Sequence, residues 1–249
     1  MSTSKLKMFS QLYTKDMREL VPEIVIVAAA AVILNGLFYF NMNRYTSFHP
    51  AVFIIPTFMV LAVAAFLPFI SSFKLVSREW SNNTVYLIMS LPVSGVMIMG
   101  AKLAALITQY IAGTLIAVLM GLFLAREAIP DIMKLISNYP DILNLAIMFY
   151  LLSIAALLFL ISMGFLSQIT GKLSSRFSSL ITFVVFLLTF YSMSKIISFS
   201  IVKLKMITAA GSSAILNNSS LTGDLLILLL AAAVVFTLAV VIYDRKIEL

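Results

Sequence analysis

Residues 74–102 read KLVSREWSNNTVYLIMSLPVSGVMIMGAK and form the most polar interruption between two long apolar runs. Four side chains in this stretch recur at three- and four-residue spacing, namely Trp80, Thr84, Leu87 and Leu91. That spacing puts them on one helical face. Pro92 ends the pattern, because proline removes a backbone donor and clashes with the preceding turn. The stretch predicts a short amphipathic helix on the polar side of a membrane, followed by a turn that leads the chain back in.

The composition around this stretch is that of an integral membrane protein. Of the 249 residues, 62% are hydrophobic and 11% are charged, which is more apolar surface than a soluble domain can bury. Six apolar runs approach the roughly 20 residues that a helix needs to cross hydrocarbon: 24–40, 51–73, 103–125, 142–169, 180–197 and 225–243. No Pro- or Ser-rich linker divides them. We expect an all-α polytopic membrane protein with six transmembrane helices in a single domain, residues 1–249.

Two further segments are predicted to associate with the membrane without crossing it. Residues 1–23 place apolar side chains on one side of a helix and charged ones on the rest, which predicts an interfacial elbow helix in the headgroup plane. Residues 198–221 are too long and too apolar for a plain loop and predict a re-entrant or extracellular pair of short helices in the outer leaflet. The alternative is an extra span, which would put the C-terminus outside.

The basic residues predict the orientation. The net charge is +7, and Lys and Arg flank the spans, so we assign them to anionic membrane lipids and expect no nucleic-acid partner. With the N-terminus inside, eleven of the seventeen Lys and Arg fall on the inner side and six on the outer side. The positive-inside rule therefore predicts a multi-pass protein with both termini and residues 74–102 in the cytoplasm.

Residues 74–102 also resemble the loop between the first two helical hairpins of ABC-2 type transporter permeases. The residues that carry the resemblance are, in order, Glu79, Thr84, Leu87, Leu91, Pro92, Ser94, Gly100 and Lys102. The glycine that usually precedes the threonine is Asn83 here. The resemblance covers this segment closely and the rest of the chain through its length, span count and polarity.

The resemblance implies a transmembrane permease subunit of an ATP-binding cassette exporter in the bacterial cell membrane. Two separate cytoplasmic ATPase subunits would hold the ATP and magnesium, and a second copy or a related permease would complete the pathway. The cargo would be amphipathic, such as peptides or toxins. Two alternatives remain open, namely export of drugs, lipids or ions, and a non-transporting membrane protein that sequesters a toxin or gives immunity to it.

Within this resemblance, residues 74–102 contain a coupling helix. Its ATPase-coupling residues would be Arg78, Glu79, Trp80, Thr84, Tyr86 and Leu87, and its turn would be marked by Pro92 and Lys102. The large apolar side chains would fill a groove on the ATPase, and Arg78 and Glu79 would form ion pairs at the rim. The alternative is a surface helix that holds its tryptophan at headgroup level.

A ridge of small residues follows in the third apolar run. Gln109, Gly113, Ala117 and Gly121 recur every four residues, so a neighbouring helix can approach closely. That neighbour lies either in the same bundle or in a second copy of the chain, so the ridge serves helix packing or dimer formation.

The sequence carries no motif for bond-breaking chemistry, so we expect that the chain is not itself an enzyme. The run from Gly95 to Gly100 lacks the Gly-Lys-Ser/Thr ending of a phosphate-binding loop, because Ala101 precedes Lys102. Cysteine is absent and His49 is the only histidine, so we expect no catalytic cluster, no metal site and no cofactor bound by this chain. A lipid-modifying enzyme would have to use His49 without a nearby acid. The acidic residues lie near the predicted span ends, which argues against a proton pathway.

Overall fold

The computed structural model describes residues 5–42, 54–82, 84, 93–124, 126, 129–139, 141–174, 177–209 and 218–247. This part of the chain is helical and contains no strand. Its helices are α1 (Lys5–Met42), α2 (Ile54–Ser81), α4 (Gly95–Leu124), α5 (Ile129–Asn138), α6 (Asp141–Lys172), α7 (Ser178–Ala209) and α8 (Asn218–Ile247). All except the short α5 are long and apolar enough to cross a membrane. The prediction of an all-α fold is confirmed for the described residues, and so is the prediction of six helices long and apolar enough to cross a membrane, which fits a multi-pass membrane protein.

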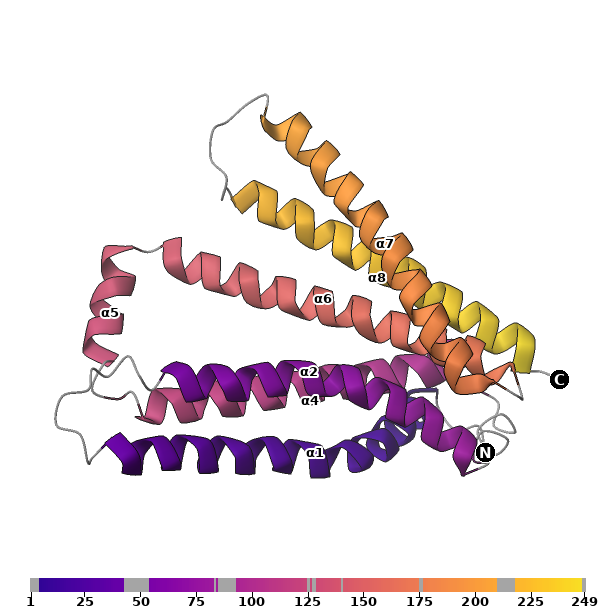
Figure 1. Cartoon of the computed structure of the whole chain (residues 1–249), viewed down its shortest axis with the longest axis horizontal. Helices are drawn as coiled ribbons and strands as arrows, with labels where there is room; N and C mark the ends of the chain where they lie inside the picture. The colour runs from indigo at the N-terminus through magenta and orange to yellow at the C-terminus, as the bar shows by residue number, and fades with distance from the viewer. Residues whose placement is uncertain are drawn as a thin grey trace.

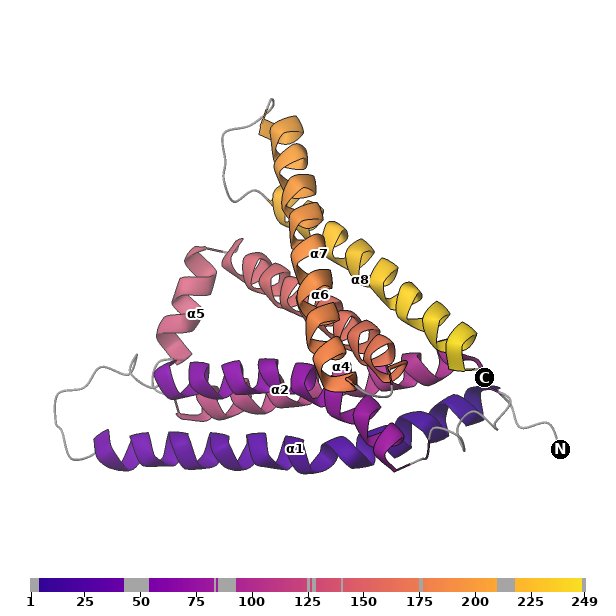
Figure 2. The ribbon, with the colours of Figure 1, turned by 45° about the vertical axis from the view of Figure 1, so that its right-hand side comes forward.

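The six long helices form two groups of three. α1, α2 and α4 pack side by side, and α6, α7 and α8 form the second group (Figure 1). The groups meet where α2 contacts α6 and α4 contacts α8, and they diverge toward the end bridged by α5 (Figures 1 and 2). The start of α1, the end of α2, the start of α4 and the end of α8 all lie at the closed end, which we call the termini end.

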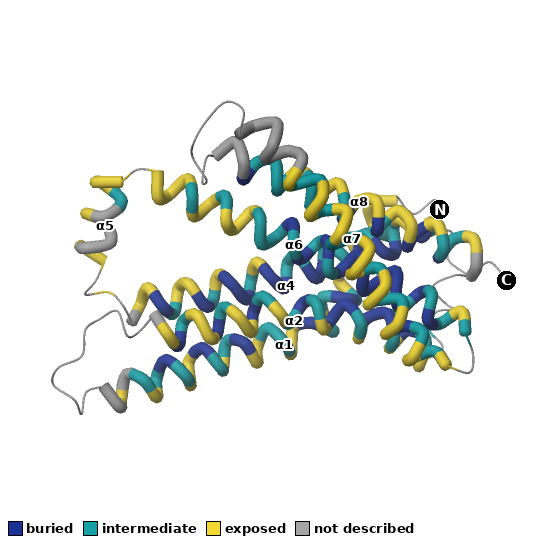
Figure 3. Tube along the Cα trace, turned by 45° about the horizontal axis from the view of Figure 1, so that its top comes forward, coloured by how far each residue is buried: buried dark blue, intermediate teal, exposed yellow. Residues whose placement is uncertain are grey.

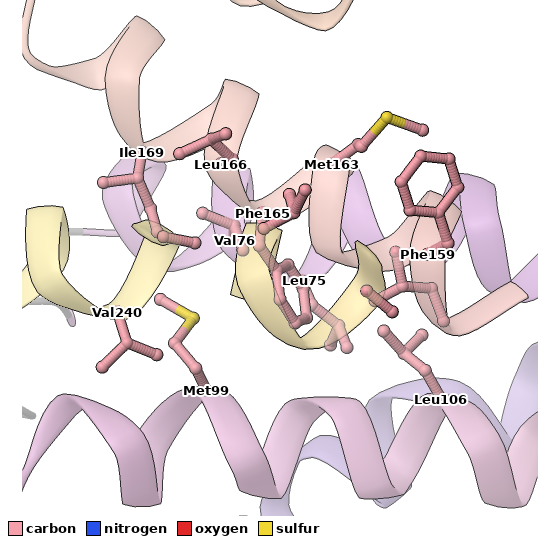
Figure 4. Packing of buried hydrophobic residues seen from close by; sticks show 14 of the residues in the cluster. Leu75, Val76, Met99, Leu106, Phe159, Met163, Phe165, Leu166, Ile169 and Val240 are labelled. Carbon is pink, nitrogen blue, oxygen red and sulfur yellow. The ribbon is translucent and has the colours of Figure 1, made fainter. Parts of the chain in front are cut away.

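The main core lies at the termini end. Its buried apolar side chains come from α1, α2, α4, α6 and α8, and Figure 4 shows the interlocking of Leu75, Met99, Phe165 and Val240. Buried positions gather where the helices converge, whereas the outer part of α6 is largely exposed (Figure 3). A smaller cluster, which includes Ala64 and Ala117, joins α1, α2 and α4 further along. The termini end is therefore the well-packed part of the bundle.

α1 differs from the predicted elbow followed by a separate span. It is one continuous helix of 38 residues with Pro22 inside it. The helix changes direction in its N-terminal part (Figure 2), and a proline is the usual cause of such a bend because it removes one backbone hydrogen bond. Asp16 and Leu20 are buried in the bundle, so the N-terminal part packs against other helices instead of lying alone at the surface.

Residues 74–102 are also divided differently from the prediction. Residues 74–81 are the end of α2, so Arg78, Glu79 and Trp80 belong to the second long helix. Residues 95–102 are the start of α4, which places Lys102 in its third turn. Tyr86, Leu87 and Pro92 lie outside the described residues, as does most of the predicted coupling helix.

The predicted outer pair of short helices at 198–221 takes another form in the described residues. Residues 198–209 continue α7, and residues 218–221 begin α8. Residues 178–209 contain no glycine or proline, so nothing in the sequence interrupts the helix there. Residues 210–217 lie outside the described part of the chain.

Candidate functional site

Four charged side chains from three helices meet near the termini end, and we call them the ionic cluster. They are Lys15 and Asp16 of α1, Glu79 of α2 and Lys102 of α4. Lys102 Nζ lies 2.6 Å from Glu79 Oε1 and 3.3 Å from Asp16 Oδ1. Lys15 Nζ donates to the same Glu79 oxygen at 2.5 Å. The cluster therefore connects α1, α2 and α4 through one shared carboxylate.

The ionic cluster is almost completely enclosed. The side chains of Lys102, Asp16 and Glu79 are 1%, 3% and 9% exposed, while that of Lys15 is 37% exposed. Two positive and two negative groups give no net charge, which limits the cost of removing them from water. Removing one member leaves a buried charge without its counter-ion, and this is much more costly than replacing a whole pair.

A second polar group lies on the same three helices, and we call it the Glu23 cluster. The Glu23 carboxylate of α1 accepts hydrogen bonds from Ser71, from Lys74 Nζ at 2.6 Å and from Gln109 Nε2 at 2.8 Å. Glu23 follows Asp16 by seven residues, and Gln109 follows Lys102 by seven. Seven residues are about two helical turns, so the Glu23 cluster lies about 10 Å further along the same faces.

A third polar contact joins the two groups of helices. Tyr110 of α4 and Ser153 of α6 share a hydrogen bond of 2.6 Å between their hydroxyls, and Thr114 and Tyr150 share one of 3.0 Å. The rings of Tyr110 and Tyr150 stack with centroids 5.9 Å apart. These groups are uncharged, so they can separate at a much lower cost than the ionic cluster.

The predicted ATPase-coupling residues have different surroundings. Arg78 is half exposed, with Nη1 3.5 Å from Glu19 Oε2. Glu79 is buried in the ionic cluster and does not form an exposed rim contact. Trp80 is partly buried against the main core, and the Thr84 hydroxyl donates to the Glu79 carbonyl at 3.3 Å. Among the predicted coupling residues that the structure describes, Arg78 is the one whose side chain is exposed enough to contact a partner.

The small-residue ridge packs within the chain. A Cβ added to Gly113 would lie 3.1 Å from Ala64 Cβ, and one added to Gly121 would meet Thr57, both in α2. Ala117 is fully buried, and Gln109 contacts Glu23 and belongs to the Glu23 cluster. The ridge therefore lets α4 and α2 approach closely.

Several residues of the ionic cluster and the Glu23 cluster are not among the site residues predicted from the sequence. Lys15, Asp16, Glu23, Ser71 and Lys74 were not singled out, although the shared seven-residue spacing of Asp16 with Glu23 and of Lys102 with Gln109 was readable. Lys102 was expected to mark a loop and instead is buried inside α4. The spacing alone cannot say which helices carry complementary charges to the same place.

The ionic cluster and the Glu23 cluster join helices through ion pairs and hydrogen bonds. Among the described residues, no group of three or more His, Cys, Asp or Glu side chains is placed to hold a metal ion. Six helices of the described structure are long and apolar enough for a multi-pass membrane protein. Ion pairs between side chains join α1, α2 and α4 near the termini end. No family model, curated protein or solved structure matched this chain in the comparisons.

Proposed function

We propose that this chain is the transmembrane permease subunit of an ATP-binding cassette exporter that moves amphipathic cargo out across a bacterial cell membrane. The observation that carries the proposal is the ionic cluster. It connects the end of α2 and the start of α4, which form the two ends of the segment that resembles ABC-2 permeases, to α1. A force applied to the connection between α2 and α4 would therefore reach three long helices together.

The proposed mechanism is a movement of one group of helices against the other. Two separate ATPase subunits bind and hydrolyse ATP and press on the α2–α4 connection in the cytoplasm. The ionic cluster holds α1, α2 and α4 together, whereas the α4–α6 hydroxyl contacts between the groups are uncharged. The groups change their relative positions, and ATP shifts the population between the two arrangements. The chain itself breaks no bond and binds no cofactor.

In this proposal Arg78 provides the most direct contact with the ATPase. Its side chain is half exposed at the end of α2, whereas Glu79 serves the ionic cluster and Trp80 packs on the core. Both termini lie in the cytoplasm with this contact. A second copy of the chain or a related permease supplies the other side of the pathway.

Co-purification tests this proposal. The full chain is co-expressed with each ATP-binding cassette ATPase of the source genome and purified in a mild non-ionic detergent. We expect one ATPase to co-purify with the wild-type chain. Arg78→Glu should weaken the affinity of that ATPase for the chain about tenfold, which corresponds to about 1.4 kcal/mol of binding free energy. Arg126→Glu is the matched control, because Arg126 is exposed and follows α4 at the opposite end.

Two results would contradict the proposal. If the folded wild-type chain retains none of the ATPases, the exporter assignment fails and sequestration of a toxin becomes the better explanation. If Arg78→Glu and Arg126→Glu weaken the association equally, the ATPase does not bind at the end of α2.

A further inference from the structure

A groove lies between α7 and α8, away from the ionic cluster. Its volume is about 300 Å³, and it is lined by Met193, Ile196, Ile197, Ser200, Ile227, Leu230, Ala231 and Val234. Ser200 is the one polar residue of the lining, and its hydroxyl already donates to the Ile196 carbonyl. The lining therefore offers apolar contacts to whatever occupies it.

The groove has a floor and an open side. Met193, Ile197 and Ala231 pack against the main core, so they close the groove on the inside. Leu230 and Val234 are 67% and 51% exposed, so the groove opens on the flank of the bundle. α7 and α8 separate from the rest of the bundle in this direction (Figures 1 and 2), which leaves that flank facing the lipid. An alkyl chain can enter it from the bilayer.

Asp224 lies one turn from the groove on the same side of α8. It precedes Ile227 by three residues, and positions three and four apart on a helix are neighbours. It also stands near the start of the membrane-spanning part of α8, which begins at Leu221. This is the depth at which a polar headgroup lies beside its own alkyl chain.

The Asp224 carboxylate has a buried oxygen, Oδ1, without a hydrogen-bond partner. The other such side-chain atoms in the described residues are the uncharged Asn35 Oδ1, Gln109 Oε1 and Tyr243 Oη. The acids Asp16, Glu19, Glu23, Glu79 and Asp244 all have a donor or cation from the chain itself. A buried carboxylate oxygen without a donor is costly, and a cation bound beside it removes that cost.

Lys195, the basic residue of α7 whose side chain the structure describes, does not supply this cation. Lys195 lies over the ring of Tyr191, with Nζ 5.7 Å from the centroid. Helical spacing puts Tyr191 and Lys195 on the side of α7 opposite to Met193, Ile197 and Ser200. The groove's apolar lining therefore lies one helical turn from an acid whose Oδ1 has no hydrogen-bond partner.

We propose that the α7–α8 groove and Asp224 form a binding site for a single-chain cationic amphiphile. The carboxylate takes the cationic head, and the groove takes the alkyl chain. This inference rests on the proposed export function, because it gives the amphipathic cargo a positive charge and a binding site toward the outer side of the membrane, at the end of α8 opposite to the cytoplasmic termini end. Charge complementarity selects this occupant over a neutral or anionic chain.

Photo-crosslinking of the purified full chain tests the site without an ATPase. The probe is a long-chain alkyl amine with a photoreactive group on the chain, and labelled peptides are identified by mass spectrometry. We expect labelling of α7 and α8 that is competed by dodecylamine and not by dodecanol. Asp224→Asn should weaken this labelling about tenfold, and Asp224→Glu should restore most of it.

Two further variants complete the test. Ala231→Trp should block labelling by filling the groove, whereas Asp141→Asn, an exposed acid at the start of α6, should leave it unchanged. Thermal melting confirms that each variant is folded. The proposal is overturned if Asp224→Asn leaves the labelling unchanged or if a neutral probe labels equally strongly. An absence of label in α7 and α8 also overturns it. None of these results bears on ATPase association, so the two proposals can fail separately.

Discussion

At the scale of single residues, Lys102 is the most unusual side chain of the described structure. A lysine with 1% exposure is rare, and it persists here because Glu79 and Asp16 both face its ammonium group. Lys15 then satisfies the Glu79 oxygen from the exposed side. The ionic cluster thus resembles a small closed network more than a simple pair, and each member depends on the others.

Removing the lysine charge should destabilise the protein strongly. We expect Lys102→Met to lower the free energy of unfolding by about 3–5 kcal/mol, because Glu79 and Asp16 then compete for the single cation of Lys15. Thermal melting of the purified protein in detergent measures the effect. The double variant Glu79→Gln, Lys102→Met removes one charge of each sign and should be more stable than Lys102→Met alone. A double variant that is less stable would show that the ion pair does not account for the loss.

The contact of α8 with the start of α4 also depends on one residue. Asp244 Oδ1 accepts from the Gly95 amide at 2.9 Å, which satisfies one of the free donors at the N-terminus of α4 and places a negative charge there. We expect Asp244→Ala to cost about 1 kcal/mol, as the loss of a helix cap does. Thermal melting again gives the readout. The neighbouring Arg245→Ala should have little effect on stability because Arg245 is exposed. If both variants lose the same free energy of unfolding, Asp244 does not act as a cap of α4.

At the scale of elements, close packing of α4 on α2 holds the first group together. Gly113 faces Ala64 and Gly121 faces Thr57, so the small residues of α4 meet small residues of α2. In a membrane, helices associate through such close contacts and through interhelical hydrogen bonds, since lipid is as apolar as the helix surface. The Glu23 cluster adds those hydrogen bonds on the same face.

A larger side chain at this contact should separate the two helices. Gly121→Leu places its Cβ against Thr57 and should lower the free energy of unfolding by about 1–3 kcal/mol through overpacking. Gly36→Leu in α1 is the control, because nothing lies within 4 Å of a Cβ added there. Both proteins are compared by thermal melting in the same detergent. Equal behaviour of the two variants would contradict the packing role of Gly121.

At the scale of the whole molecule, the bundle is closed near one end and open toward the other. The main core, the ionic cluster and the capping of α4 by Asp244 all lie toward the termini end. Toward the opposite end the two groups diverge (Figure 1). The α7–α8 groove opens on the flank of the bundle. The buried apolar contacts and ion pairs are therefore concentrated toward the termini end.

The proposed orientation can be tested directly because the chain contains no cysteine. Single cysteines are placed at exposed positions of the two ends, Ser81→Cys at the end of α2 and Asn138→Cys at the end of α5. In intact cells we expect a membrane-impermeant maleimide to label Asn138→Cys and to spare Ser81→Cys. Permeabilised cells should show labelling of both. The reverse pattern in intact cells would place the termini end outside and would contradict the positive-inside assignment.

The sequence determined the class of the protein. Run length and hydropathy are local properties, and the described residues of each of the six long apolar runs lie in a helix that is long enough to cross hydrocarbon. The sequence did not determine where those helices end. The expected boundaries before Ile24, after Phe73 and after Ile197 all fall inside continuous helices, because polar residues next to an apolar run suit a helix end and a longer buried helix equally well.

Only the tertiary structure decided which charges meet. Glu79 lies 64 positions from Lys15 in the chain and 23 from Lys102, and nothing in their local sequence distinguishes an exposed rim contact from a buried pair. A lysine near a span end can extend to the headgroups or turn inward, and the choice depends on whether another helix brings a carboxylate to it. In this protein α1 and α2 bring Asp16 and Glu79 to Lys102, and their combined charge makes burial of the lysine stable.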